Sequence, residues 1–371
     1  MDLRTKTQII FFQPKVTDRL TGHLKYLYLS LLKVPDLKEK LLIVTANIHE
    51  YSLLNRHHHS VAFWTTEDGH QHTWNAIAKS RIVFIDDMEK QCPPEFLSLV
   101  NPNTLINLWH GKDGKETGFL YLESLPQFTP YMSILNSIRS ETPVLSPGLG
   151  EHDTSLKKAL PGARLFHAPD IRTWGIFERE FENSFNVDVE ALEMLKKTSA
   201  TKSVLWCPTF RDSQIIDAYE EVDFSEINSA CKQSGTMFYI KPHRHDWRLQ
   251  NQNKGYSNVI FIDSFSDVYP LIKYVDLVIT DYSSIQIDLF ENGIPLVRFL
   301  LDHTKYTGFR RVKDISSLPL AETFFDSSAL IKYLSDGVFP NAKLIHRDTV
   351  QEEELWHSLI HRILDSGTII Q

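Results

Sequence analysis

VITDYSSIQIDLFENG, residues 278–293, combines the signals of a strand, a polar turn and a helix start. The apolar run 276–280 is typical of a buried parallel strand, and Ser283 precedes Gln286 by the spacing of a capping box. Gly293 is suited to end the helix. The first N–H groups of a helix lack internal partners and lie at the positive end of its dipole. The stretch therefore predicts a phosphate site at the carboxyl edge of a sheet, with a capped helix of no special function as the alternative.

Composition limits the class of protein. A chain of 371 residues with 42% hydrophobic residues can bury two cores. The net charge of −8 argues against a general nucleic-acid binder. Cys92, Cys207 and Cys231 are few and widely spaced, which indicates neither a disulfide framework nor structural zinc and favours the cytoplasm. No signal peptide or transmembrane run is evident, so we expect at most peripheral contact with the cytoplasmic face of a membrane.

Short apolar runs alternate with helical patterns along most of the chain. This alternation predicts an α/β protein with two doubly wound Rossmann-like domains facing a cleft. We expect an N-terminal domain over 1–175 and a C-terminal domain over 176–349. Between about 143 and 175, prolines and glycines predict turns and the domain linker. Residues 350–371 form an amphipathic tail that should pack back on the body of the protein.

Three further segments follow predicted strands and carry polar side chains. In the first, His110 enters a loop that contains Gly111 and Lys112, where close backbone approach to a ligand is easy and a base lies among cations. A structural histidine is the alternative.

In the second segment, Thr209 and Arg211 follow a strand that ends near Pro208. Arg211 could pair with a phosphate through two N–H groups, or with a surface acid such as Asp212. In the third, Lys241 and His243 follow another strand and can face the same edge.

These segments together resemble the CDP-glycerol glycerophosphotransferase family, the teichoic-acid primases and polymerases of bacterial envelopes. The resemblance rests on four blocks in the family's order, Trp109-His110-Gly111, Pro208-Thr209-Phe210-Arg211, Lys241-Pro242-His243, and Thr280-Asp281-Tyr282-Ser283-Ser284 with Asp288. Where the family usually carries a Pro-Arg-Asn-Asp-like segment, this chain has Ala168-Pro169-Asp170-Ile171-Arg172.

The resemblance implies a GT-B-type architecture, with the acceptor side in the domain over 1–175 and donor binding in the domain over 176–349. It also implies a transferase that moves an alditol phosphate, glycerol phosphate foremost, to a hydroxyl of a cell-surface glycan or a lipid-linked acceptor and releases CMP. Its donor would be CDP-glycerol or CDP-ribitol, with no metal and no other cofactor. The catalytic residues implied are His110 and His243. The donor and phosphate-binding residues implied are Gly111, Lys112, Thr209, Arg211, Lys241, Asp281, Ser283, Ser284 and Asp288.

Other chemistries find less support in the residues. Histidines at 57–59, 70 and 72 could hold a transition metal, but solvated loop histidines explain them as well. Asp281 and Asp288 are not an obvious carboxylate pair for glycoside hydrolysis. Three readings stay open: the phosphotransferase, a GT-B glycosyltransferase or nucleotide-sugar epimerase of surface or capsule polysaccharide synthesis, and a binding protein without catalysis.

Overall fold

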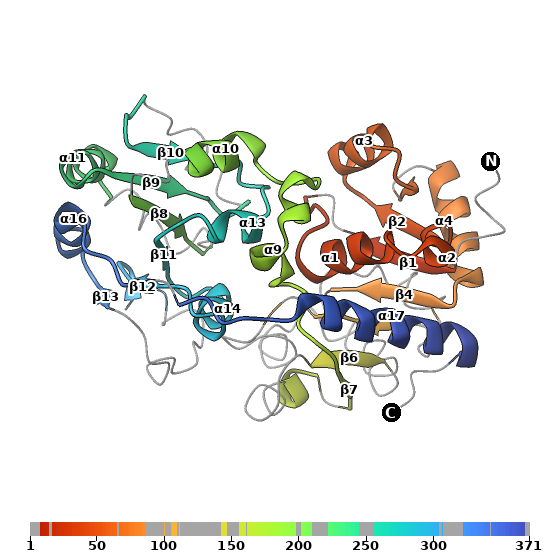
Figure 1. Ribbon diagram of the computed structural model, residues 1–371. Helices are drawn as coiled ribbons and strands as arrows, with labels where there is room; N and C mark the ends of the chain where they lie inside the picture. Colours follow the sequence, from red (N-terminus) through yellow and green to blue (C-terminus); the bar gives the residue numbers. More distant parts are fainter. Residues whose placement is uncertain are drawn as a thin grey trace. The chain divides into compact units, whose positions relative to one another are not determined.

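Figure 1 shows the computed structural model, an α/β protein with two parallel sheets of seven and six strands. The structure describes residues 8–14, 17–64, 67–86, 100, 105–109, 111, 142–146, 156–160, 162–197, 202–209, 222–244, 255–303, 306, 322–341 and 343–367. The chain divides into two compact units. The first contains Met1–His110, Thr117–Trp174 and Asp348–Gln371, and the second contains Gly111–Glu116 and Gly175–Arg347.

The sheet of the first unit has the order β3-β2-β1-β4-β5-β6-β7. Its strands are β1 (Ile9–Gln13), β2 (Leu41–Thr45), β3 (Val61–Phe63), β4 (Ile82–Ile85), β5 (Leu105–Asn107), β6 (Pro143–Ser146) and β7 (Arg164–His167). β1 lies at the centre, where Phe11 is opposite Ile43 on β2 and Phe84 on β4. All neighbouring strands are parallel, which explains why β1, β2 and β4 are uninterrupted apolar runs.

Helices from both ends of the chain belong to the first unit. They are α1 (Gly22–Leu31), α2 (Pro35–Lys38), α3 (Ile48–Arg56), α4 (Glu67–Lys79) and α17 (Thr349–Ser366). The long C-terminal helix α17, dark blue in Figure 1, buries a face that contains Trp356, Ile360, Ile363 and Leu364. Trp356 donates from Nε1 to the carbonyl of Pro169 at 3.0 Å, and Nε2 of His357 lies 2.8 Å from Oγ of Ser30. Within the described ranges, every helix is too short or too polar to cross a membrane.

The sheet of the second unit has the order β10-β9-β8-β11-β12-β13. Its strands are β8 (Lys202–Cys207), β9 (Thr236–Ile240), β10 (Val259–Phe261), β11 (Leu277–Thr280), β12 (Leu296–Phe299) and β13 (Thr323–Phe324). The helical elements from the unit boundary onward are α9 (Trp174–Phe177), the 3₁₀ helix η3 (Arg179–Asn183), α10 (Val189–Lys197), α11 (Phe224–Ser234), α13 (Tyr269–Ile272), α14 (Ile285–Glu291) and α16 (Ser327–Asp336).

The second sheet has a topological switch point between β8 and β11: the strands are added outward from β8 on one side and outward from β11 on the other, and all remain parallel. Parallel pairing sets Cys207 opposite Thr280 and Trp206 opposite Ile240, so β9, β8 and β11 end at the same edge. In open α/β sheets, ligands bind beyond the carboxyl ends of the strands at such a switch point. The loops that follow β9, β8 and β11 are therefore where a ligand is expected to bind.

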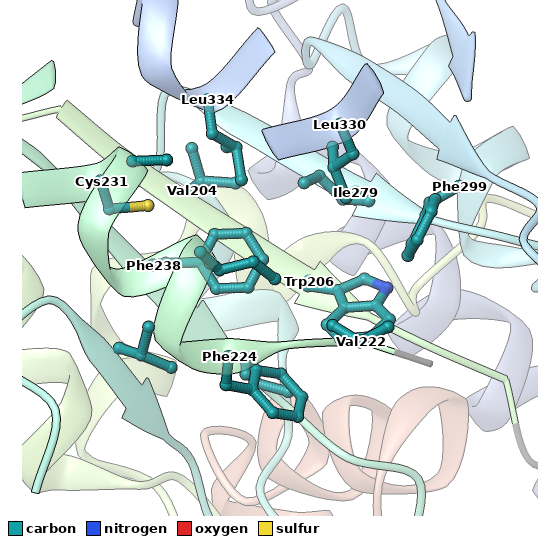
Figure 2. Packing of buried hydrophobic residues seen from close by; sticks show 14 of the residues in the cluster. Val204, Trp206, Val222, Phe224, Cys231, Phe238, Ile279, Phe299, Leu330 and Leu334 are labelled. Atoms are coloured by element: carbon teal, nitrogen blue, oxygen red, sulfur yellow. The ribbon is translucent and has the colours of Figure 1, made fainter. Parts of the chain in front are cut away.

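An aromatic core supports this sheet (Figure 2). The indole of Trp206 on β8 packs against Phe224, Phe238 and Phe299, with ring centroids 6.2, 6.3 and 5.8 Å away. Leu330 and Leu334 of α16 and Cys231 of α11 complete the part of the core that Figure 2 labels on the helix side. Aromatic pairs at these separations add to the stabilisation from burial alone. This core therefore supports β8, β9 and β11, the strands that precede the three loops.

Two expectations about local structure are wrong. The region after residue 143 contains two parallel strands, β6 and β7, where the sequence predicts only turns and a linker. β7 is an edge strand whose residues are half-buried or exposed, so it carries no apolar run that a pattern could detect. The sequence also predicts a helix over 267–274, but the helix there is limited to α13, and Pro270 lies in its first turn, where proline is tolerated.

Candidate functional site

The loop after β11 contains the serine turn, Asp281-Tyr282-Ser283-Ser284, and leads into α14. The capping box between Ser283 and Gln286 is absent. The helix begins at Ile285, so Ser284 occupies the cap position, with a helical backbone and no side-chain cap bond. The residue three positions after Ser284 is Ile287, which cannot complete a capping box. Ser283 and Ser284 are half-buried, so their hydroxyl groups lie near the surface of this edge.

A buried carboxylate joins the serine turn to the loop after β8. Oδ1 and Oδ2 of Asp281 each lie 3.0 Å from the backbone N of Thr209, and Oδ1 also accepts from Oγ1 of Thr209 at 2.5 Å. The same oxygen accepts from the backbone N of Tyr282 at 2.6 Å. Asp281 is 1% exposed and Thr209 is 8% exposed. Asp281 therefore holds the two loops on either side of the switch point together, and its predicted contact with the donor stays a prediction.

A second hydrogen bond joins the ends of β8 and β11, the strands that precede these two loops. Oγ1 of Thr280 donates to the carbonyl of Cys207 at 2.8 Å, and both residues lie in the last pair of the β8–β11 register. Burial raises the pKa of the Cys207 thiol to about 12, so it stays protonated and is not a nucleophile at neutral pH.

Asp288 lies in α14 and is fully buried. Its Oδ2 accepts from the hydroxyl of Tyr269 at 2.5 Å, which links α14 to α13. The structure thus gives this carboxylate a supporting partner beneath the serine turn. Its predicted role toward the donor phosphate stays a prediction.

Lys241 and His243 follow β9, the strand on the other side of β8. The backbone N of Lys241 donates to the carbonyl of Trp206 at 2.9 Å, so the β9 ladder continues to this residue. Both side chains are partly buried. Burial holds the pKa of the Lys241 ammonium below its ordinary value, and the charge of Arg244 lowers it further, against the opposing influence of Cys207 and nearby acids. The lysine is therefore the titratable cation of this edge.

The loop after β5 has an unusual backbone. Trp109 has a φ of 59° although it is not glycine, and Gly111 has a φ of 150°. A bulky side chain in the left-handed region costs on the order of 1–3 kcal/mol, and such strain persists only where surrounding contacts enforce it. The Trp109 side chain is buried with Val144, Leu156 and Leu160. The chain is thus forced into a defined path as it approaches position 110.

Three of the predicted site residues, His110, Lys112 and Arg211, lie outside the described residues. Among the described ones, the structure brings Thr209, Asp281, Ser283 and Ser284 to one edge, with Lys241 and His243 at the end of the neighbouring strand. Within the described chain, no three His, Cys, Asp or Glu side chains gather closely enough to share a metal ion. Metal independence itself stays a prediction.

Comparison with known protein families agrees with this arrangement of residues. A family model described as CDP-Glycerol:Poly(glycerophosphate) glycerophosphotransferase matches residues 1–346. The chain belongs to this family. It is accordingly a glycerophosphotransferase-family enzyme, and the resemblance inferred from the four sequence blocks is confirmed. No curated protein sequence matched the chain.

Solved structures share the fold at low sequence identity. The wall teichoic acid polymerase TagF, in a histidine-to-alanine variant, is 18% identical with a TM-score of 0.66, and the match covers 97% of this chain and 84% of that one. Another TagF variant, soaked with CDPG, has the same identity and TM-score and coverages of 98% and 84%. A putative UDP-N-acetylglucosamine 2-epimerase from Listeria monocytogenes is 11% identical with a TM-score of 0.56, covering 97% and 98%. The GT-B-like fold is therefore confirmed.

Several supporting residues lack a readable signal in the sequence. Tyr269 lies 19 positions before Asp288, and His23 lies 147 positions before Asp170, with which it pairs. Of these residues, only Asp170 lies in a segment that the sequence singles out, Ala168 to Arg172, where the chain departs from the family's usual pattern.

Proposed function

We propose that this enzyme transfers an alditol phosphate, glycerol phosphate foremost, from a CDP-alditol to a hydroxyl of a cell-surface glycan or lipid-linked acceptor. The observation that carries the proposal is the meeting of three family blocks at one sheet edge. Thr209, Lys241 and the serine turn follow β8, β9 and β11, and two of these strands flank the switch point. This edge combines hydroxyl groups and backbone N–H groups with a cation, which are the groups that bind a diphosphate.

In the proposed reaction, the acceptor oxygen attacks the β-phosphorus of the CDP-alditol. The bond from that phosphorus to the oxygen that bridges the two phosphates breaks, and CMP leaves with the bonding electrons. The hydroxyl proton passes to His110, and His243 binds or protonates the phosphate side. Phosphoryl transfer depends mainly on alignment and charge stabilisation, which Lys241, Arg211 and the serine turn would supply without a metal.

The partners and the location follow from the same proposal. TagF was soaked with CDPG, which supports CDP-glycerol as the donor to try first. A wall or capsule acceptor that is lipid-linked would place the enzyme at the cytoplasmic face of the membrane, by peripheral contact. No nucleic-acid partner is proposed, because the chain carries a net charge of −8.

A donor panel tests the proposal. CMP release should occur with CDP-glycerol or CDP-ribitol when a teichoic-acid-type or capsule-type acceptor is present, and UDP-N-acetylglucosamine should give no UDP. The reverse pattern would replace the proposal with a nucleotide-sugar glycosyltransferase or epimerase, which share the fold. Tight binding of a CDP-alditol without turnover on any acceptor would indicate a binding protein.

The lowered pKa of Lys241 predicts how donor binding depends on pH. A lysine is charged below its pKa, so a lowered pKa means that the charge is lost before pH reaches the ordinary lysine value of about 10.4. The affinity for CDP-glycerol should therefore begin to fall at a lower pH than the titration of an ordinary lysine would cause, and the complete loss should be about tenfold, since a charged hydrogen bond is lost. Calorimetric titrations between pH 7 and 10 measure this change.

Two variants make the pH test specific. Lys241→Arg keeps the charge throughout and should flatten the profile, although the bulkier head group lowers the affinity at neutral pH. Lys232→Met, which removes an exposed lysine from α11, should reproduce the wild-type profile. A wild-type profile that stays flat to pH 10 would remove Lys241 from donor binding.

A further inference from the structure

A buried histidine in α1 contacts the strained backbone that leads to position 110. Nδ1 of His23 lies 2.8 Å from the carbonyl oxygen of Trp109, and its Nε2 lies 3.0 Å from Oδ1 of Asp170. His23 is 3% exposed and Asp170 is 6% exposed. All three residues belong to the first compact unit. The histidine therefore joins the end of the β5 loop to the segment that follows β7.

The hydrogen-bond chemistry fixes the protons of this pair. A carbonyl oxygen only accepts, so Nδ1 of His23 must carry a proton that it donates to Trp109. Nε2 then faces a carboxylate oxygen that already accepts from the backbone N of Arg172 at 3.0 Å. These contacts are satisfied together only when a proton also lies between Nε2 and Oδ1. His23 and Asp170 thus form a buried pair that presents one fixed N–H to the Trp109 carbonyl.

The other side of Trp109 is held as well. Its backbone N donates to Oδ1 of Asn107, a fully buried residue at the end of β5, at 2.9 Å. The two hydrogen bonds hold the backbone N–H and the carbonyl of Trp109, whose φ of 59° lies in the left-handed region. The carbonyl of Trp109 belongs to the peptide group that continues to residue 110. A bond to this oxygen consequently restrains the plane of that peptide group.

We propose that His23, oriented by Asp170, is a positioning residue for His110. Its bond to the Trp109 carbonyl restrains the peptide group that follows Trp109, which is the one that leads into residue 110. The inference rests on the proposed function for the role of His110. Asn107 contributes the second restraint, and Asp170 acts through His23.

Two substitutions of nearly equal size separate positioning from simple structural support. His23→Asn keeps an N–H donor near the position of Nδ1, and so keeps the bond to Trp109 while losing Asp170. His23→Gln keeps a donor near the position of Nε2, and so keeps Asp170 while losing Trp109. Each variant loses one of the two hydrogen bonds of His23, so their melting temperatures should be alike. A purely structural role predicts that they are equally active.

The expected kinetic result is a split between the two variants. The kcat for CMP release should fall about a hundredfold in His23→Gln, because a misplacement of about 1 Å at a reacting group has this effect. In His23→Asn it should stay within about threefold of wild type. The KM for CDP-glycerol should change little in either, because Thr209, Lys241 and the serine turn lie in the other compact unit. Equal losses in both variants, or a larger loss in His23→Asn, would overturn the proposal.

A measurement that needs no turnover keeps this inference separate from the proposed function. The ring signals of His110, among those of 16 histidines, can be identified in ¹⁵N spectra by their loss in His110→Ala. They should shift in His23→Gln and stay in place in His23→Asn, and unchanged signals in both would overturn the inference. If the wild-type protein releases no CMP from any donor, the proposed function fails and these spectra alone decide the role of His23.

Discussion

Replacing His110 with alanine should lower CMP release at least a hundredfold while the fold and the affinity for CDP-glycerol stay close to wild type. An imidazole side chain titrates near neutral pH and can take the proton of an attacking hydroxyl, so its removal leaves the acceptor without a general base. A general base or a positioned donor of this kind contributes about 10²–10³ in rate. The measurement is kcat for CMP release, with donor affinity by calorimetry and stability by thermal unfolding.

Two further substitutions serve as comparisons for His110→Ala. His57→Ala removes an exposed histidine next to α3 and should leave kcat, donor affinity and melting temperature unchanged. His243→Ala, on the donor side, should lower the affinity for CDP-glycerol as well as kcat. Near-wild-type CMP release by His110→Ala would remove this residue from the mechanism. It would also leave the bond from His23 to Trp109 with a structural role alone.

The fold was predictable because parallel strands covered on both faces are continuous apolar runs. β1, β2, β8, β9 and β11 contain such runs, and all but β2 are followed directly by a proline or a charged residue that marks the end of the strand. The edge strand β7 and the short strand β13 lack such runs, since partial burial removes the pressure for apolar side chains. The sequence pattern is therefore informative where a strand is buried on both faces.

The strand-end positions of the described candidate residues were predictable, whereas their mutual geometry was not, and their roles toward a donor stay predictions. Thr209, Lys241 and the serine turn could be placed at strand ends from local patterns, but their adjacency depends on pairings across tens of residues. The capping box failed because Ser283 and Ser284 are both plausible caps and the helix starts one residue later than the Ser283 spacing requires. The contact between His23 and Asp170 has no local counterpart, because it joins segments 147 positions apart.

Asp281 offers the clearest test of how the loops after β8 and β11 are held together. Asp281→Ala should lower the free energy of unfolding by roughly 3–5 kcal/mol, because it leaves the buried N–H groups of Thr209 and Tyr282 and the Thr209 hydroxyl without this acceptor. Asp281→Asn keeps one carbonyl oxygen and should cost about 1–2 kcal/mol. Urea unfolding, followed by far-UV circular dichroism, measures both values.

The partner substitution Thr209→Val turns this into a test of mechanism. It removes only the hydroxyl bond to Asp281 and should cost about 1 kcal/mol. In combination with Asp281→Ala its effect should largely disappear, because the two side chains share that bond and neighbouring substitutions are not additive. If the carboxylate acts by holding the two loops, donor affinity should fall in proportion to the loss of stability across the three variants. A large loss of affinity in Asp281→Asn at nearly unchanged stability would instead mean that Asp281 contacts the donor directly, because only a direct ligand role separates binding from folding.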